Sequence, residues 1–275
     1  MRDNPFSMLY RGLKALLPAA ALWAVLVCVF CCMPGPSHVR SAAAGLSAEA
    51  ILEAKLREAG ASDVQEWIDG TLAPQDIGSA EWYILALSQY GDYDFTAYRA
   101  AAETHISREA VTGAAALKLG IALASSGSGS GFIAESIREA AGEQGIMNRI
   151  FGLHLLENGF LCPDVTRAEL VDAILSLQFE DGGFALFGKN GDVDVTAMTV
   201  QALTPAYLSG EDPRVTEAVD RALLFLSGRQ EPSGGYSGFG AENAESAAQV
   251  LTALSGLGID CAADSRFIRE GHTIT

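Results

Sequence analysis

Apolar positions along most of the chain recur at helical spacing. The clearest case is 212–227, where apolar side chains fall three and four positions apart and charged side chains take the opposite face. Asp212 is a favourable N-cap, and Pro213 stands at the first helical position, where its missing N–H costs nothing. A second amphipathic helix is predicted over 166–178, because it opens with a Thr-x-x-Glu capping box.

Five further segments are apolar or small on nearly every side, which is typical of helices covered by several neighbours. They are 79–90, 110–124, 145–156, 195–207 and 245–256. No alternating pattern of period two competes with them, so we predict an all-α fold in which buried and half-exposed helices alternate. The Ser/Gly-rich stretch 125–131 is flanked by helical patterns, and we interpret it as a loop between two helices.

The alternation contains a repeat. A Gln-x4-Gly-aromatic sequence occurs at 178–184 and again at 230–236, 52 residues later. Asp-x-Asp at 192–194 precedes one apolar run, and Asn-x-Glu at 243–245 precedes the next, 51 residues later. The paired glycines in each loop fit a tight turn that needs positive φ. We therefore predict stacked helical hairpins with a period near fifty residues.

The N-terminus differs from the rest of the chain. An uncharged apolar run of 19 residues at 15–33 follows three basic residues. This pattern predicts either a secretory signal or one membrane-spanning helix, and Ala42–Ala44 offers a small-residue cleavage site. We assign residues 1–44 as signal peptide or membrane anchor and residues 45–275 as the domain. The domain is then expected to be extracytoplasmic, either secreted or anchored by residues 15–33.

Charge excludes one large class of function. The formal net charge of the chain is −16; residues 1–40 contribute +3, so the remainder carries −19. Such an acidic domain is unsuited to nucleic-acid binding and is not attracted to an anionic lipid surface. Three of the five cysteines lie in the apolar run, leaving Cys162 and Cys261 in the domain. Two cysteines form no disulfide framework, their pairing stays open, and their spacing gives no zinc site.

Three stretches resemble a known superfamily. The segment 221–236 resembles the Q-W repeat of squalene and oxidosqualene cyclases, with Tyr236 in the final Trp position. The helix start at 192–203 is similar to that of terpenoid cyclases and protein prenyltransferases. The same helix start resembles still more closely the bacterial exported proteins of this superfamily and the cobalamin carriers of the intrinsic factor and transcobalamin type, and residues 145–159 also resemble that bacterial group. The resemblance implies an α/α toroid with an inner and an outer ring of helices.

Departures from the superfamily's motifs argue against its enzymatic chemistries. The resemblance would place a DxDD acid motif at 192–195, but Val195 takes the position of a carboxylate. Protonation of an alkene needs an acid whose proton is made labile by its neighbours, so cyclisation is not expected. Prenyl transfer through zinc needs a Cys beside Asp194, and none is present. The chain also ends within an expected outer helix at 266–275, so we expect an incomplete, C-terminally truncated toroid.

Polar and aromatic residues near the starts of the buried helices are the candidate site. The candidate ligand-binding residues are Asp192, Asp194, Asn243, Glu245, Phe184, Tyr236, Glu81 and Trp82. In parallel inner helices these groups should gather at one mouth of the ring. The polar ones either bind a ligand or cap helices, and the aromatic ones either line a pocket or pack between repeats. Asp192 and Asp194 are also the candidate catalytic acids, and no metal ligand set is expected.

Three functions remain open at this point. The first is an exported or cell-surface binding or display module for a corrinoid or another bulky apolar ligand, with no cofactor required. The second is a terpenoid-cyclase-like or prenyltransferase-like enzyme. The third is a structural arc of a larger surface protein. The expected partners are a small apolar or corrinoid ligand, and a membrane through the N-terminal segment if that segment stays uncleaved.

Overall fold

A computed structural model describes residues 48–274, except 76–77, 79, 130 and 239. Residues 1–44, for which a signal peptide or anchor is predicted, lie outside the described part. Helices make up most of the described chain, and its only sheets are two antiparallel pairs of short strands. The prediction of a mainly helical domain is therefore confirmed. Within the described ranges, no helix combines the length and the apolarity that crossing a membrane requires.

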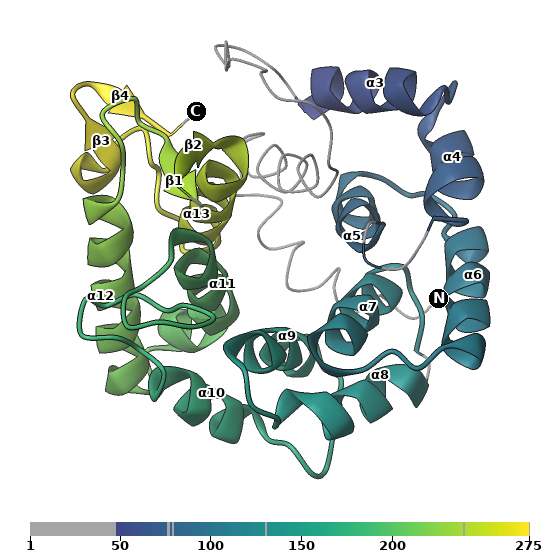
Figure 1. Cartoon of the computed structure of the whole chain (residues 1–275), viewed down its shortest axis with the longest axis horizontal. Coiled ribbons are helices and arrows are strands. Elements are labelled where there is room, and N and C mark those ends of the chain that lie inside the picture. Colours follow the sequence, from purple (N-terminus) through teal and green to yellow (C-terminus); the bar gives the residue numbers. More distant parts are fainter. Residues whose placement is uncertain (1–47, 76–77, 79, 130, 239, 275) are drawn as a thin grey trace.

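Five helices form a curved inner row (Figure 1). They are α5 (Glu81–Tyr90), α7 (Gly113–Ser125), α9 (Ile146–Glu157), α11 (Val193–Ser209) and α13 (Ala244–Gly256). Each packs against the next one along the chain. All five begin and end within three residues of the predicted bounds. Their sequences are apolar on most sides because each contacts inner and outer neighbours, and their side chains supply nearly half of the core.

The remaining helices follow the outer side of the same arc (Figure 1). They are α3 (Ala48–Ala59), α4 (Val64–Trp67), α6 (Thr96–Arg108), α8 (Gly131–Ser136), α10 (Arg167–Leu175) and α12 (Pro213–Gly228). Helix α4 continues into the π-helical turn η1 (Ile68–Leu72), and α8 continues into η2 (Ile137–Ala141). The predicted loop at 125–131 connects α7 to α8, as expected.

The two amphipathic helices start where their caps predict. The Asp212 carboxylate accepts a hydrogen bond from the backbone N–H of Arg214 at 2.9 Å, and Pro213 opens α12. The capping box of Thr166 and Glu169 is formed in both directions. Helix α10 ends at Leu175, before the predicted bound at 178. Gln178 lies in the loop that follows, and its side chain makes hydrogen bonds outside the helix.

Short strands interrupt the helices in two places where no pattern predicted them. Strand β1 (Tyr236–Gly238) pairs antiparallel with β2 (Ala241–Asn243), directly before α13. Strand β3 (Ile268–Arg269) pairs with β4 (His272–Thr273) after the 3-10 turn η3 (Ser265–Phe267). Strands of two or three residues are too short for an alternating pattern to appear in the sequence.

Two expectations about the repeat are wrong. The segment 266–274 forms η3 and the β3–β4 hairpin rather than an outer helix, because Glu270 and Gly271 both take positive φ (48° and 87°) and reverse the chain. The period near fifty holds from α9 to α11 and from α11 to α13, but not earlier. The starts of α5, α7 and α9 follow one another at much shorter intervals, since the loops between them lack the Gln-x4-Gly turn.

Candidate functional site

The two Gln-x4-Gly loops share one hydrogen-bond pattern. The Gln178 side-chain amide donates to the carbonyls of Gly182 and Ala218, both at 2.8 Å. The Gln230 amide likewise donates to Gly234, at 3.0 Å, and to Phe267, at 2.9 Å. Each glutamine therefore closes its own turn and ties that turn to the next outer segment. The repeat seen in the sequence is a repeat of geometry.

One glycine in each loop packs closely against the backbone of the outer segment that follows the loop. Gly182 has φ of 88°, and a Cβ there would lie 2.6 Å from the Arg221 carbonyl oxygen. Gly234 has φ of 89°, and a Cβ there would lie 2.2 Å from the Thr273 carbonyl oxygen. Only glycine tolerates both the conformation and the contact. The β3–β4 hairpin thus meets the second loop as α12 meets the first.

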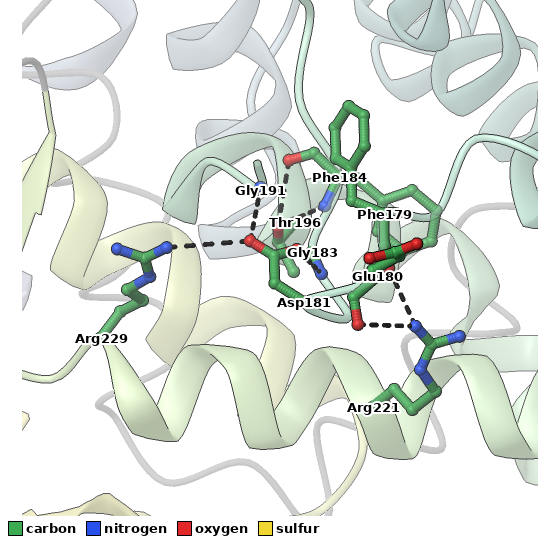
Figure 2. A network of polar contacts seen from close by, with 9 residues as sticks. All are labelled: Phe179, Glu180, Asp181, Gly183, Phe184, Gly191, Thr196, Arg221 and Arg229. Atoms are coloured by element: carbon green, nitrogen blue, oxygen red, sulfur yellow. Dashed lines mark hydrogen bonds and ion pairs between the residues drawn. The ribbon is translucent and has the colours of Figure 1, made fainter. Parts of the chain in front are cut away.

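Side chains on and around α12 lock the first loop (Figure 2). The Arg221 guanidinium donates to the carbonyls of Phe179, at 2.9 Å, and Glu180, at 3.2 Å. Asp181 accepts from the backbone N–H groups of Gly183 and Gly191, at 3.0 and 2.9 Å, and faces Arg229 across 3.8 Å. These bonds fix the chain that leads into α11.

Capping accounts for two of the predicted site residues. The Asp192 carboxylate accepts from the backbone N–H of Val195 at 3.0 Å, and the Asn243 side-chain oxygen accepts from Ser246 N at 2.9 Å. The two residues are the N-caps of α11 and α13, which pack side by side. Glu245 lies in the first turn of α13, half-buried, where the helix dipole favours an acid.

Asp194 is not explained by capping. Burial raises its pKa, and the neighbouring Asp192 charge adds to the rise, while the nearby Ser246 hydroxyl partly offsets it. Neither Asp194 Oδ1 nor Ser246 Oγ makes a well-formed hydrogen bond within the described chain, although both atoms are buried. A buried polar atom without a partner is costly, so this carboxylate is kept at some expense of stability.

The side chains of Asp194, Asn243 and Ser246 all lie next to Gly238. A Cβ at Gly238 would lie 2.5 Å from Ser246 Oγ, 3.0 Å from Asn243 Nδ2 and 3.3 Å from Asp194 Oδ2. We call Asp192, Asp194, Asn243 and Ser246 the Asp194 cluster. The sequence repeat identified three of its members. Ser246 was missed, because a lone serine inside an apolar helix start carries no signal of its own.

The predicted aromatic residues lie in the core. Phe184 and Tyr236 are completely buried. The Phe184 backbone exchanges two hydrogen bonds with the Thr196 hydroxyl, at 2.9 and 3.1 Å, which ties this residue to the first turns of α11 (Figure 2). Burial raises the pKa of Tyr236, whose hydroxyl has no partner within the described chain. Both rings pack where a repeat loop meets its inner helix.

Glu81 and Trp82 lie apart from the Asp194 cluster. They begin α5, and α7 and α9 stand between α5 and α11 in the inner row (Figure 1). Trp82 packs at 6.0 Å from the Phe151 ring, with the Lys118 ammonium 5.8 Å from its own ring centre. The structure therefore distributes the eight predicted residues between two places along the inner row.

The remaining histidine and cysteine side chains of interest form no metal or disulfide site in the described chain. Burial lowers the pKa of His154 to about 4, so this side chain is neutral at pH 7. Cys162 and Cys261 are both free thiols. In the part of the chain that the structure covers, no group of three or more His, Cys, Asp or Glu side chains is arranged to hold a metal ion.

Comparison with known proteins identifies no relative. No family model, curated protein or solved structure is significantly similar to this chain. The likeness to terpenoid cyclases and cobalamin carriers therefore rests on the three motifs described above.

Proposed function

We propose that the chain is a binding module of the α/α-toroid type, exported or displayed at a cell surface, with a bulky ligand held at the Asp194 cluster. The two curved rows of helices support the toroid assignment, because parallel inner helices set their N-termini side by side. The acidic domain and the apolar N-terminal run support export.

One observation carries the proposal: Asp194 Oδ1 and Ser246 Oγ are both buried, and neither makes a well-formed hydrogen bond within the described chain, so each has at most the other as a weak partner. Stability alone does not favour such a pair, since each desolvated polar atom opposes folding. Perturbed carboxylates of this kind gather at functional sites. A ligand that donates hydrogen bonds, such as one bearing several amide groups, would satisfy both atoms. Corrinoids carry such amides, and the motif resemblance makes them the first class to test.

A second candidate, acid-catalysed terpenoid cyclisation, is favoured by the raised pKa of Asp194, which keeps its proton to higher pH. The chemistry opposes it. Alkene protonation needs a strong acid, and Val195, itself buried, occupies the position of a further carboxylate. We expect no cyclised product from squalene or geranylgeranyl diphosphate in product analysis. A product that disappears in Asp194→Asn would restore the enzyme.

Equilibrium dialysis against cobalamin and cobinamide, read by corrinoid absorbance, tests the binding function. We expect saturable binding that weakens roughly tenfold in Asp194→Asn and in Ser246→Ala, since each removes one partner of a buried hydrogen bond. Gly238→Ala should block binding, because its Cβ enters the cluster. Glu217→Gln, on the exposed face of α12, is the control and should bind as the wild type does. Absence of binding in the wild type would leave the structural-arc function in its place.

A further inference from the structure

A cavity of about 470 Å³ lies between α6 and the start of α5, closed on a third side by the loop after η1. This volume is within the range of small-molecule sites, about 300–1,000 Å³. Its walls are small and apolar, with Ala73, Ala80 and Ala102 each from a different segment. The cavity is separate from the Asp194 cluster, and the function proposed above makes no use of it.

Two buried side chains that line this cavity each carry one polar atom without a hydrogen-bond partner in the described chain. Glu81 is 2% exposed and Tyr98 is 4% exposed. The unpartnered atoms are Glu81 Oε2 and the Tyr98 hydroxyl. Both side chains line the same cavity, and burial together with the Glu81 charge raises the pKa of Tyr98. The cavity therefore presents one acceptor and one hydroxyl donor at neighbouring points of its wall.

The other polar contacts of Glu81 restrict what it can bind. Its Oε1 accepts a hydrogen bond from the backbone N–H of Gly78 at 2.6 Å, so only Oε2 is available. The Lys118 ammonium lies 3.8 Å from Oε2 and donates to the Gly78 carbonyl at 3.0 Å. Because Lys118 already balances the carboxylate, a second cation would be repelled by the ammonium. An anion would be repelled by Glu81 itself. A neutral donor, such as a hydroxyl, fits between them.

The outer part of the cavity is polar. Thr104, His105, Arg108 and Glu109 line it, and His105 Nε2 lies 4.0 Å from Glu109. These side chains, at the C-terminal end of α6 and just after it, offer both hydrogen-bond donors and acceptors. A ligand with several hydroxyl groups could satisfy them while its carbon skeleton lies against the alanines.

We propose that this cavity binds a neutral polyhydroxylated ligand of the size of a mono- or disaccharide, with one hydroxyl bridging Glu81 Oε2 and the Tyr98 hydroxyl. That ligand hydroxyl donates to the carboxylate and accepts from the tyrosine. Water alone would satisfy the same atoms without selectivity for any solute. Selectivity among ligands of one shape and different charge therefore separates the two situations.

Saturation-transfer NMR on the full chain is the test, with glucose, galactose and maltose as neutral probes. Glucosamine and glucuronate are the charged counterparts of the same ring. We expect at least one neutral sugar to bind saturably and to exceed both charged analogues in affinity. Tyr98→Phe, which removes only the hydroxyl, should weaken binding roughly tenfold. Ala101→Leu, which narrows the cavity from α6, should abolish it.

Tyr93→Phe, at a half-buried tyrosine outside this lining, is the matched control and should bind as the wild type does. Three results would overturn the proposal. They are no saturable binding of any neutral sugar, a preference for a charged analogue, and unchanged binding in Tyr98→Phe. None of them bears on the Asp194 cluster, since corrinoid binding is measured separately.

Discussion

The two repeat loops use the same turn but meet different partners. The loop at 178–184 packs on a long helix, α12, whose Arg221 also binds the glutamine side-chain oxygen at 3.2 Å. The loop at 230–236 packs on the short β3–β4 hairpin, and Gln230 Oε1 is buried there with no partner in the described chain. The Gln-x4-Gly motif thus specifies the turn and its docking to the next segment. The three hydrogen bonds from Arg221, which we call the arginine lock, occur within the described chain only at the first loop, where that next segment is a helix.

The glycines should give the largest effects. Gly182→Ala forces positive φ on alanine and a clash with the backbone of α12, so we expect a loss of about 3 kcal/mol in the free energy of unfolding. Gly234→Ala should cost less, about 2 kcal/mol, because a hairpin with strands of two residues can move away more easily than a long helix. Urea unfolding measures both.

Gly188→Ala is the control for these two variants. Gly188 also has positive φ, 101°, but no atom lies within contact distance of its added Cβ. It should lose only the conformational part, about 1 kcal/mol. Equal losses in all three variants would show that the docking contacts contribute nothing.

The arginine lock should come next in size. Arg221→Ala removes three hydrogen bonds to the first loop, and two of their acceptors are part-buried. We expect a loss of about 2 kcal/mol, measured by urea unfolding. Arg214→Ala is the matched control on the same helix, because its ion pairs are exposed and should contribute less than about 1 kcal/mol. If the two variants lose the same stability, Arg221 does not lock the loop.

The smallest expected effect is that of Asp194→Asn, which should raise the free energy of unfolding rather than lower it. The folded chain raises the pKa of Asp194 above its unfolded value, so stability from this group is lost as pH rises through the folded pKa. Asp194→Asn should therefore be slightly more stable than the wild type at pH 7, by less than about 1 kcal/mol. The difference should vanish in acid, where Asp194 is protonated in both states. Thermal unfolding across pH measures it, and a destabilised variant at pH 7 would show that the carboxylate is structural.

The sequence predicted the five inner helices and the outer helices α10 and α12 for identifiable reasons, whereas α3, α4, α6 and α8 were not predicted individually. The inner helices are apolar on all sides over ten residues or more, and the caps at Asp212 and Thr166 mark helix starts locally. The two hairpins were missed because strands of two or three residues have no period. The outer helix expected at 266–275 followed from the repeat. The structure has a reverse turn there instead, because Glu270 and Gly271 both take positive φ, and this turn was not recognised from the sequence.

The candidate site was only partly predictable. Equivalent repeat positions meet when inner helices are parallel, so Asp194 and Asn243 could be found from spacing. Glu81 is separated from that cluster because α7 and α9 lie between α5 and α11 (Figure 1). The sequence spacing of these residues does not show how far apart their helices lie along the arc. Tyr98 lies in an alanine-rich helix, and its burial opposite Glu81 is a product of tertiary packing.

The central claim is that Asp194 is a half-buried carboxylate whose buried Oδ1 lacks a well-formed hydrogen bond and is available to a ligand. Carbon-13 NMR of the carboxyl groups across pH measures it directly, with Asp194→Asn to assign the signal. In the free chain we predict a pKa for Asp194 above the ordinary aspartate value of about 3.9, which falls when a hydrogen-bond-donating ligand such as cobinamide binds. An Asp194 that titrates at or below the ordinary value, and does not shift with ligand, would contradict the account.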